Sequence, residues 1–380
     1  MVKGQGILYS RGHFQLAMAS VLYPLVHWLA ELTQNISSSP LLSGPLLLAV
    51  LYAPETVRGL VLNFATKVPG LQVPPRNFDF ATATTVLRVL FGLGVVSQLN
   101  GTLNTMAANS WRVRPSEGWD WPKEIAVVTG GSGGIGRQIV QRLADLGVRV
   151  AVLDTQNVPE EMKYSARIYF FKCDVTSSES VAKAADSVRR KLGNPSILIN
   201  NAGVSIISPI LKMSESNLRK MFGVNTLSHW FTTQQFVPHM VDKNKGHVVT
   251  VASVASFVAL PTAAHYSATK ASAMSFHESL TCELKHCHNT TNVLTTIVHP
   301  SFVRTPLIKD AIGDLEQSGL RMLTPDDVAE PIVAQIKSRR GGQLIIPSWA
   351  SPIATIKAWP NWTQELFQNA VGRLTGTIVV

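Results

Sequence analysis

The chain has 380 residues, more than one typical domain needs, so a catalytic unit of ordinary size leaves a long remainder to explain. Only 15% of the residues are charged and the mean hydropathy is +0.15, which directs attention to apolar segments. The formal net charge of +10 comes from scattered basic residues without a nucleic-acid motif, so we expect no nucleic-acid partner and expect attraction to anionic lipid headgroups instead.

Three apolar runs occupy the N-terminal region, at residues 14–32, 40–54 and 81–99. None is a clean spanning helix, which needs about 20 apolar residues without charge. The second run is short, and the first and third contain charged residues such as Arg88. We therefore predict that residues 1–110 attach to a membrane, by spanning or by interfacial helices, with the number of passes left open. A buried, soluble helical domain is the alternative.

After the third run the chain turns polar, and Pro and Trp in residues 100–122 indicate an interfacial linker, which we place at 111–122. From 123 to 348, short β-branched runs alternate with helical stretches. This alternation predicts βαβ units, and so a Rossmann-type α/β domain with a doubly wound parallel sheet of about seven strands. The strands are expected at residues 125–129, 148–154, 168–175, 197–200, 247–253, 293–299 and 343–346.

A glycine-rich turn, TGGSGGIG at residues 129–136, lies between the first predicted strand and a helical stretch. Glycines there let the backbone approach a pyrophosphate, while free N–H groups and the positive end of the helix dipole point at it. A glycine cluster alone can be an ordinary tight turn. Its place between a strand and a helix predicts dinucleotide binding.

Asp154 closes the second predicted strand. Its carboxylate can accept hydrogen bonds from the hydroxyls of an adenosine ribose and would repel a 2′-phosphate, so we expect NAD in preference to NADP. Arg137, directly after the glycine turn, is the residue that could favour NADP. No Lys or Arg stands directly beside Asp154, so NAD remains the expected cofactor.

Tyr266 and Lys270 are four residues apart at the start of a helical stretch, so both side chains lie on one face of it. A free tyrosine has a pKa of about 10, and a neighbouring ammonium favours the phenolate. We therefore predict that Lys270 lowers the pKa of Tyr266, which then acts as general acid in reduction and as general base in oxidation.

Ser253 ends the fifth predicted strand, at the carboxyl edge where ligands bind in open α/β sheets. Its hydroxyl could hold the substrate oxygen beside Tyr266, and Ser256 is the local alternative. The segment NNAG, residues 200–203, ends the fourth strand with amides that either satisfy backbone groups or touch the cofactor.

The three cysteines, Cys173, Cys282 and Cys287, are too few for a disulfide framework. Their spacing matches no zinc pattern. We therefore expect no metal site, and a reducing compartment for the catalytic part.

The C-terminal tail, residues 349–380, mixes Trp and Leu with basic side chains. Such a mixture suits an amphipathic helix at a membrane interface. A helix that packs on the catalytic domain explains it equally well.

In their order and spacing, these motifs resemble the classical short-chain dehydrogenase/reductase family over residues 123–348. The resemblance implies hydride transfer between a nicotinamide and a substrate carbon, with Tyr266 exchanging the proton and Ser253 orienting the carbonyl. It implies that Lys270 holds the nicotinamide ribose. It adds Asn225 as a fourth catalytic residue, which would position a water in the proton relay.

Downstream, the family usually has Pro-Gly and then Val-x-Thr, where this chain has Ser301 in place of the glycine. The local turn and the orientation of the nicotinamide are therefore the points at which the chain departs from the family pattern. The resemblance and the motifs together assign cofactor binding to Gly130, Ser132, Gly134, Ile135, Gly136, Asp154, Asp174, Val175, Asn201, Ala202, Gly203, Tyr266, Lys270, Pro300, Val303 and Thr305.

The apolar extension, the linker WDWPKEI and Asp154 resemble the membrane-associated subgroup that includes retinol and 17β-hydroxysteroid dehydrogenases. This implies a lipophilic alcohol of retinoid, steroid or fatty type as substrate, and a homo-oligomer. It also implies the endoplasmic reticulum or lipid-droplet surface, with the catalytic domain facing the cytosol. Residues 306–323 are either a mobile substrate loop or core. An NADPH-dependent carbonyl reductase of lipid or secondary metabolism and a non-catalytic lipid-surface scaffold are the alternatives.

Overall fold

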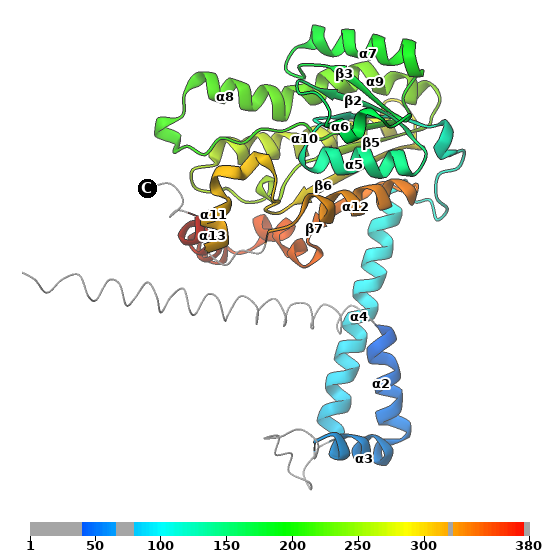
Figure 1. Cartoon of the computed structure of the whole chain (residues 1–380). Coiled ribbons are helices and arrows are strands. Elements are labelled where there is room, and N and C mark those ends of the chain that lie inside the picture. The colour runs from blue at the N-terminus through cyan, green and yellow to red at the C-terminus, as the bar shows by residue number, and fades with distance from the viewer. Residues whose placement is uncertain (1–39, 66–79, 318–321, 376–380) are drawn as a thin grey trace, which may run out of the picture. The chain divides into compact units, whose positions relative to one another are not determined.

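The structure is a computed structural model, and it describes residues 40–65, 80–317 and 322–375. The chain divides into two compact units, Met1–Ala107 and Ala108–Val380 (Figure 1). The first apolar run expected from the sequence lies outside the described residues.

The described part of the N-terminal unit consists of helices α2 (Pro40–Tyr52), α3 (Pro54–Ala65) and α4 (Phe80–Ala108). Within α4, the stretch Thr84–Ala108 has 25 residues and contains an 18-residue window with a mean hydropathy of 1.4, of which 6% is buried. By length and composition this stretch is sufficient to cross a membrane, whereas α2 is too short. The helix continues to Ala108, so the polar residues from 100 onward are still helical, and the linker placed at 111–122 begins after the helix ends.

The C-terminal unit is built on one parallel sheet with the strand order β3-β2-β1-β4-β5-β6-β7 (Figure 1). This confirms the predicted doubly wound α/β fold. The order reverses between β1 and β4, and ligands bind at the carboxyl ends of strands at such a switch point. The strands are β1 (Ile125–Thr129), β2 (Arg149–Asp154), β3 (Ile168–Lys172), β4 (Ile197–Asn200), β5 (Gly246–Val251), β6 (Val293–Pro300) and β7 (Gly342–Ile346).

Two hydrophobic cores cover the two faces of the sheet. On one face, α5 (Gly134–Asp145) and α12 (Pro325–Lys337) contribute fully buried residues such as Ile139 and Ile332. The other core joins α7 (Ser178–Leu192), α9 (Ser228–Asp242) and α10 (Ala264–His286), with Phe236, Met240 and Leu284 at its centre. Because both faces of the central strands β1 and β4 are buried, these strands are nearly continuous apolar runs without alternation.

Shorter elements connect these layers. Two strands end earlier than predicted, β3 at Lys172 and β5 at Val251, because the chain turns away from the sheet before Asp174 and before Ser253. The connecting elements are η1 (Trp121–Lys123), α6 (Glu160–Lys163), η2 (Ile210–Lys212), α8 (Glu215–Phe222), the π-helix η3 (Gly223–Leu227), η4 (Val254–Ser256), η5 (Pro306–Ala311) and α11 (Ile312–Gln317).

The C-terminal tail forms η6 (Ser348–Ala358) and α13 (Asn361–Thr375). Ile356, 3% exposed, packs in a small cluster with Phe257 and Val258, which follow η4. Trp362 and Leu366 are instead 68% and 62% exposed. The tail therefore packs on the catalytic unit with one side and keeps apolar side chains at the surface on another.

The segment after Thr305 also has two kinds of residue. Leu315 in α11 is 2% exposed, and Leu307 in η5 is 36% exposed. Part of this segment thus belongs to the interior of the unit, while part presents apolar surface.

Candidate active site

The glycine turn forms a cradle in which several positions accept no side chain. Gly130 and Gly134 have left-handed φ angles of 64° and 53°, which favour glycine. A Cβ at Gly130 would lie 2.9 Å from the Cα of Ala202, and a Cβ at Gly136 would lie 2.2 Å from the Gly130 carbonyl oxygen. At Gly133 a Cβ would meet no described atom within 4 Å, so the cradle is open there.

Helix α5 starts at this open position. Gly133 is its N-cap, and no side chain of the described residues caps it. The N–H groups of its first turn therefore remain available, together with the positive end of the helix dipole. These features fit the pyrophosphate of a dinucleotide.

Residues that follow β4 form hydrogen bonds with the glycine turn. Asn201 donates through Nδ2 to the carbonyl oxygens of Thr129 (3.0 Å) and Gly130 (3.1 Å). The hydroxyl oxygen of Thr129 accepts from the backbone N–H groups of Asn201 and Ala202, both at 3.0 Å. The first of the two roles expected for these amides, satisfying backbone groups, is therefore observed. Their contact with a cofactor stays a prediction.

Asp154 lies directly beside the glycine turn. Its Oδ2 accepts from the backbone N–H of Ser132 and its Oδ1 from that of Gln156, both at 3.0 Å. A carboxylate offers about four lone-pair sites, so capacity remains for ribose hydroxyls. Arg137, the residue that could favour NADP, forms an ion pair with Glu161.

Ser253, Tyr266 and Lys270 come together at the carboxyl edge of the sheet. Ser253 follows β5, and the other two lie in the first two turns of α10. Ser253 Oγ accepts from Ala255 N (3.1 Å) and donates to Pro300 O (3.4 Å), and its side chain lies near enough to Tyr266 to lower the pKa of that phenol. Lys270 Nζ lies 5.7 Å from the centre of the Tyr266 ring and donates to the carbonyl oxygen of Val251 (2.9 Å).

The electrostatics of this group differ from the sequence-based prediction. Burial raises the pKa of Tyr266, and the side chain of Ser253 lowers it only in part. Burial also lowers the pKa of Lys270 to about 8. The prediction that Lys270 lowers the pKa of Tyr266 is therefore wrong for this arrangement, because desolvation of the phenolate dominates and Nζ is directed at a carbonyl.

Asn225 is held beside this group by a local distortion of the helix. It lies in the π-helix η3, a feature often found at functional sites, and is fully buried. Its Oδ1 accepts from Val204 N (2.8 Å), and its Nδ2 donates to Val204 O (2.9 Å) and Thr269 Oγ1 (3.1 Å). Gly203 lies between Asn225 and Lys270, since a Cβ there would be 3.6 Å from Asn225 Oδ1 and 3.7 Å from Lys270 Nζ.

Ser256, the alternative to Ser253, has a different neighbour. Its hydroxyl donates to the backbone carbonyl of Lys270 (2.9 Å) and so ties η4 to α10. Because the side chain of Ser253 is near enough to Tyr266 to influence its pKa, the arrangement favours Ser253 for a contact with substrate.

The departure from the family's Pro-Gly pattern has no conformational cost. Ser301, which follows the last residue of β6, Pro300, donates its N–H to Ile346 O (2.8 Å), and its φ is not left-handed. Thr305 reaches the glycine turn: a Cβ at Gly134 would lie 3.4 Å from its methyl carbon. Val303 is 8% exposed and belongs to the core.

Asp174 and Val175 have local roles in the turn after β3. Asp174 Oδ1 accepts from the backbone N–H and the hydroxyl of Thr176, at 2.9 and 2.8 Å. Val175 is 7% exposed and packs in the core. A contact of either residue with adenine stays a prediction.

His299 is a residue of this site that the sequence did not reveal, because a strand residue is expected to be core. Its Nδ1 lies 3.0 Å from the carbonyl oxygen of Ser253, and its Nε2 lies 3.2 Å from Gln343 Nε2. An amide NH₂ group can only donate, so His299 Nε2 accepts and Nδ1–H donates to Ser253. Burial lowers the pKa of His299 to about 4, which keeps the ring neutral.

Comparisons with known proteins agree with this geometry. Residues 124–315, about half of the chain, match the short chain dehydrogenase family model. Dehydrogenase RED2 of Cochliobolus heterostrophus is 38% identical over 243 residues, which cover 63% of this chain and 90% of the relative. Estradiol 17-beta-dehydrogenase 11 of Homo sapiens is 32% identical over 240 residues, covering 62% and 78%.

Solved structures show the same fold. An alcohol dehydrogenase from Thermococcus sibiricus, complexed with 5-hydroxy-NADP, aligns with a TM-score of 0.51 over 59% of this chain and 95% of its own. An aldohexose dehydrogenase from Thermoplasma acidophilum aligns with a TM-score of 0.50 over 59% and 92%. Both are 23% identical, so they support the fold alone.

The chain belongs to the short-chain dehydrogenase/reductase family. It is an oxidoreductase of CH–OH groups that uses NAD or NADP. The predicted resemblance to the subgroup with 17β-hydroxysteroid dehydrogenases is confirmed by these relatives.

Proposed function

We propose that this protein is an NAD-dependent dehydrogenase that interconverts a lipophilic alcohol and its carbonyl at a membrane surface. The observation that carries the proposal is the meeting of Ser253, Tyr266 and Lys270 at the same edge of the sheet as the glycine turn. In such a site a bound nicotinamide cofactor supplies or accepts the hydride.

The residues of the site handle the proton and the substrate oxygen. Because burial raises its pKa, Tyr266 is a neutral phenol near neutral pH, which is the form that donates a proton in reduction. Ser253, whose side chain lies near Tyr266, would hold the substrate oxygen beside the phenol. Lys270 would hold the nicotinamide ribose, and Asn225 would hold a water of the relay.

The preference for NAD follows from two charges. The Asp154 carboxylate lies beside the cradle, where it would repel a 2′-phosphate. Arg137 is paired with Glu161, so its charge is already offset. Both observations support NAD as the cofactor.

A lipophilic substrate and a membrane location are supported by surface features. The α4 helix is apolar and almost fully exposed, and the tail keeps Trp362 and Leu366 exposed on the catalytic unit. Relatives include an estradiol dehydrogenase by name, which acts on a steroid alcohol. Cys282 and Cys287 are exposed and unpaired, which suits a catalytic unit on the cytosolic side of the endoplasmic reticulum or of a lipid droplet.

The test uses the full chain in membranes, supplied with NAD or NADP and a panel of retinoid, steroid and fatty alcohols. We expect NADH formation, lost by about 10²- to 10⁴-fold in Tyr266→Phe because its general acid–base group is gone. Tyr164→Phe, at a tyrosine that is 84% exposed, is the matched control and should keep full activity.

Two results would contradict the proposal. Tighter binding of NADPH than of NADH would favour the carbonyl-reductase alternative, since Asp154 predicts the opposite order. A wild-type chain inactive on the whole panel with both cofactors would favour the scaffold alternative.

A further inference from the structure

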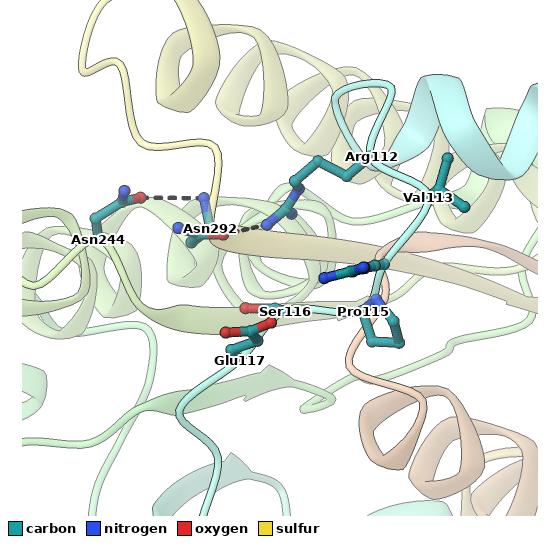
Figure 2. A pocket seen from close by; sticks show the side chains of 8 residues that line it. Arg112, Val113, Pro115, Ser116, Glu117, Asn244 and Asn292 are labelled. Atoms are coloured by element: carbon teal, nitrogen blue, oxygen red, sulfur yellow. Dashed lines mark hydrogen bonds between the residues drawn. The ribbon is translucent and has the colours of Figure 1, made fainter.

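A cavity lies at the edge of the sheet opposite to Ser253 and Tyr266. It has a volume of about 470 Å³ and is lined by residues 112–117 together with Asn244 and Asn292 (Figure 2). Asn292 directly precedes β6 and Asn244 lies two residues before β5, so the cavity lies at the amino ends of the strands, whereas Ser253 and Asp154 lie at their carboxyl ends. The proposed dehydrogenase chemistry does not use this cavity.

The segment that forms the cavity wall is firmly docked on the catalytic unit. The side chain of Asn109 makes two hydrogen bonds with the backbone of Gly341, at 3.1 and 2.8 Å. The N–H of Ser116 donates to Arg339 O (3.1 Å), and Arg340 donates to Val113 O (2.6 Å). The cavity is therefore largely preformed, as ligand sites usually are.

The cavity wall carries two arginines, Arg112 and Arg114, for which no ion pair with a carboxylate is found among the described residues. Arg112 donates to the carbonyl oxygens of Asn109 (3.1 Å) and Thr291 (2.8 Å) and to Asn292 Oδ1, all neutral acceptors. A guanidinium has five N–H donors, so two remain. Arg114 is exposed and makes no ion pair or hydrogen bond with the described residues.

The two asparagines add further donors. Asn244 Oδ1 accepts from Asn292 N (3.0 Å), and Asn292 Oδ1 accepts from Arg112, as the dashed lines of Figure 2 show. Because both amide oxygens are used within the wall, the amide NH₂ groups remain for a ligand. Glu117 is the acidic residue of the lining. The balance of two guanidiniums, two amides and one carboxylate suits an oxyanion.

We propose that this cavity binds the phosphate of an anionic phospholipid headgroup. Arginine forks match phosphate geometry in charge and shape. The segment begins directly after Ala108, the last residue of the apolar helix α4, and carries Trp111 and Val113, 63% and 70% exposed, as expected at a membrane interface. The choice of a lipid as the source of the phosphate rests on the proposed membrane attachment, whereas the phosphate chemistry does not.

The experiment measures binding of phosphatidic acid and of phosphatidylcholine to the full chain in detergent micelles, with lipid adducts counted by native mass spectrometry. Arg114→Gln should weaken the binding of phosphatidic acid about fivefold, the effect of one basic residue near a lipid surface. Glu117→Gln should strengthen it by a similar factor. Arg190→Gln on the surface of α7 removes the same charge elsewhere and should change nothing.

The outcomes separate the possible explanations. Equal weakening by Arg114→Gln and Arg190→Gln would overturn the proposal in favour of diffuse charge. Equal binding of phosphatidylcholine would overturn the need for an anion, and competition by inorganic phosphate at the affinity of the lipid would overturn the lipid source. Carbonate extraction tests membrane attachment separately, since Arg114→Gln should remain in the membrane fraction through α4.

Discussion

The two units of this chain use apolar residues in opposite ways. In the catalytic unit, strands and helices bury them: Val127, Leu198 and Ile332 are fully buried. In the N-terminal unit, Leu93 and Val96 of α4 are 53% and 64% exposed. Covering such a side chain stabilises by about 1.5 to 3 kcal/mol, so a row of exposed ones favours a lipid environment. The catalytic unit is stabilised by its own packing, whereas the described helices of the N-terminal unit leave many apolar side chains exposed.

The largest effect expected from this difference is on membrane attachment. In Leu93→Arg/Val96→Arg, each added charge costs about 2.5 to 3.5 kcal/mol at the centre of a spanning helix, so the chain should leave the membrane fraction in carbonate extraction. Turnover of a water-soluble alcohol should persist, because Tyr266 belongs to the other unit. Thr102→Arg/Thr105→Arg, near the end of α4, is the control, since its arginines can reach the interface. If Leu93→Arg/Val96→Arg stayed in the membrane fraction, the proposed attachment through the exposed apolar residues of α4 would be contradicted.

The next effect concerns the catalytic unit alone. Ser253→Ala removes a hydroxyl that lowers the pKa of Tyr266 and a contact for the substrate oxygen, so kcat should fall by about 10²- to 10³-fold. The pKa of Tyr266 should then rise further. Oxidation needs the phenolate and reduction needs the phenol, so the rising limb of the oxidation profile and the falling limb of the reduction profile should both move to higher pH. pH profiles that do not shift in Ser253→Ala would contradict the role of Ser253. Ser256→Ala is the control variant.

A smaller effect separates the role of the glycine turn in folding stability from its role in binding the dinucleotide. Gly136→Ala forces a Cβ against the Gly130 carbonyl and should lower the free energy of unfolding by about 1 to 3 kcal/mol. Gly133→Ala meets open space and should leave the melting temperature unchanged, while it weakens NADH binding if the dinucleotide occupies that space. Thermal unfolding with and without NADH measures both. Normal NADH binding by Gly133→Ala would place the pyrophosphate elsewhere.

The smallest effect is expected at His299, which acts through Ser253. His299→Leu removes the donor to the Ser253 carbonyl and should lower kcat about fivefold, the weight of about one hydrogen bond, without changing KM for NADH. His299→Asn keeps an N–H near the same place and should recover most of the loss. Since the pKa of His299 is about 4, kcat should show no titration of this group between about pH 5 and 8. If His299→Leu lowered the melting temperature enough to explain the whole decrease in kcat, His299 would only stabilise the structure.

Much of the fold was predictable because it depends on local pattern. The strands Ile125–Thr129 and Ile197–Asn200 have the predicted limits, since short β-branched runs between turns indicate buried parallel strands. The glycine turn was also readable, because the space around Gly130 and Gly136 admits no other residue. The ends of β3 and β5 were missed, because apolar residues continue past the point where the chain leaves the sheet.

By itself, the sequence determined which residues could meet: the order of the strands' ends, the glycine turn, and the tyrosine and lysine on one helical face. Only the tertiary structure decided how they act. The raised pKa of Tyr266 comes from burial, His299 meets Ser253 across neighbouring strands, and Arg112 finds Asn292 far along the chain. Such effects depend on desolvation and on partners distant in sequence, and local residue patterns carry no information about either.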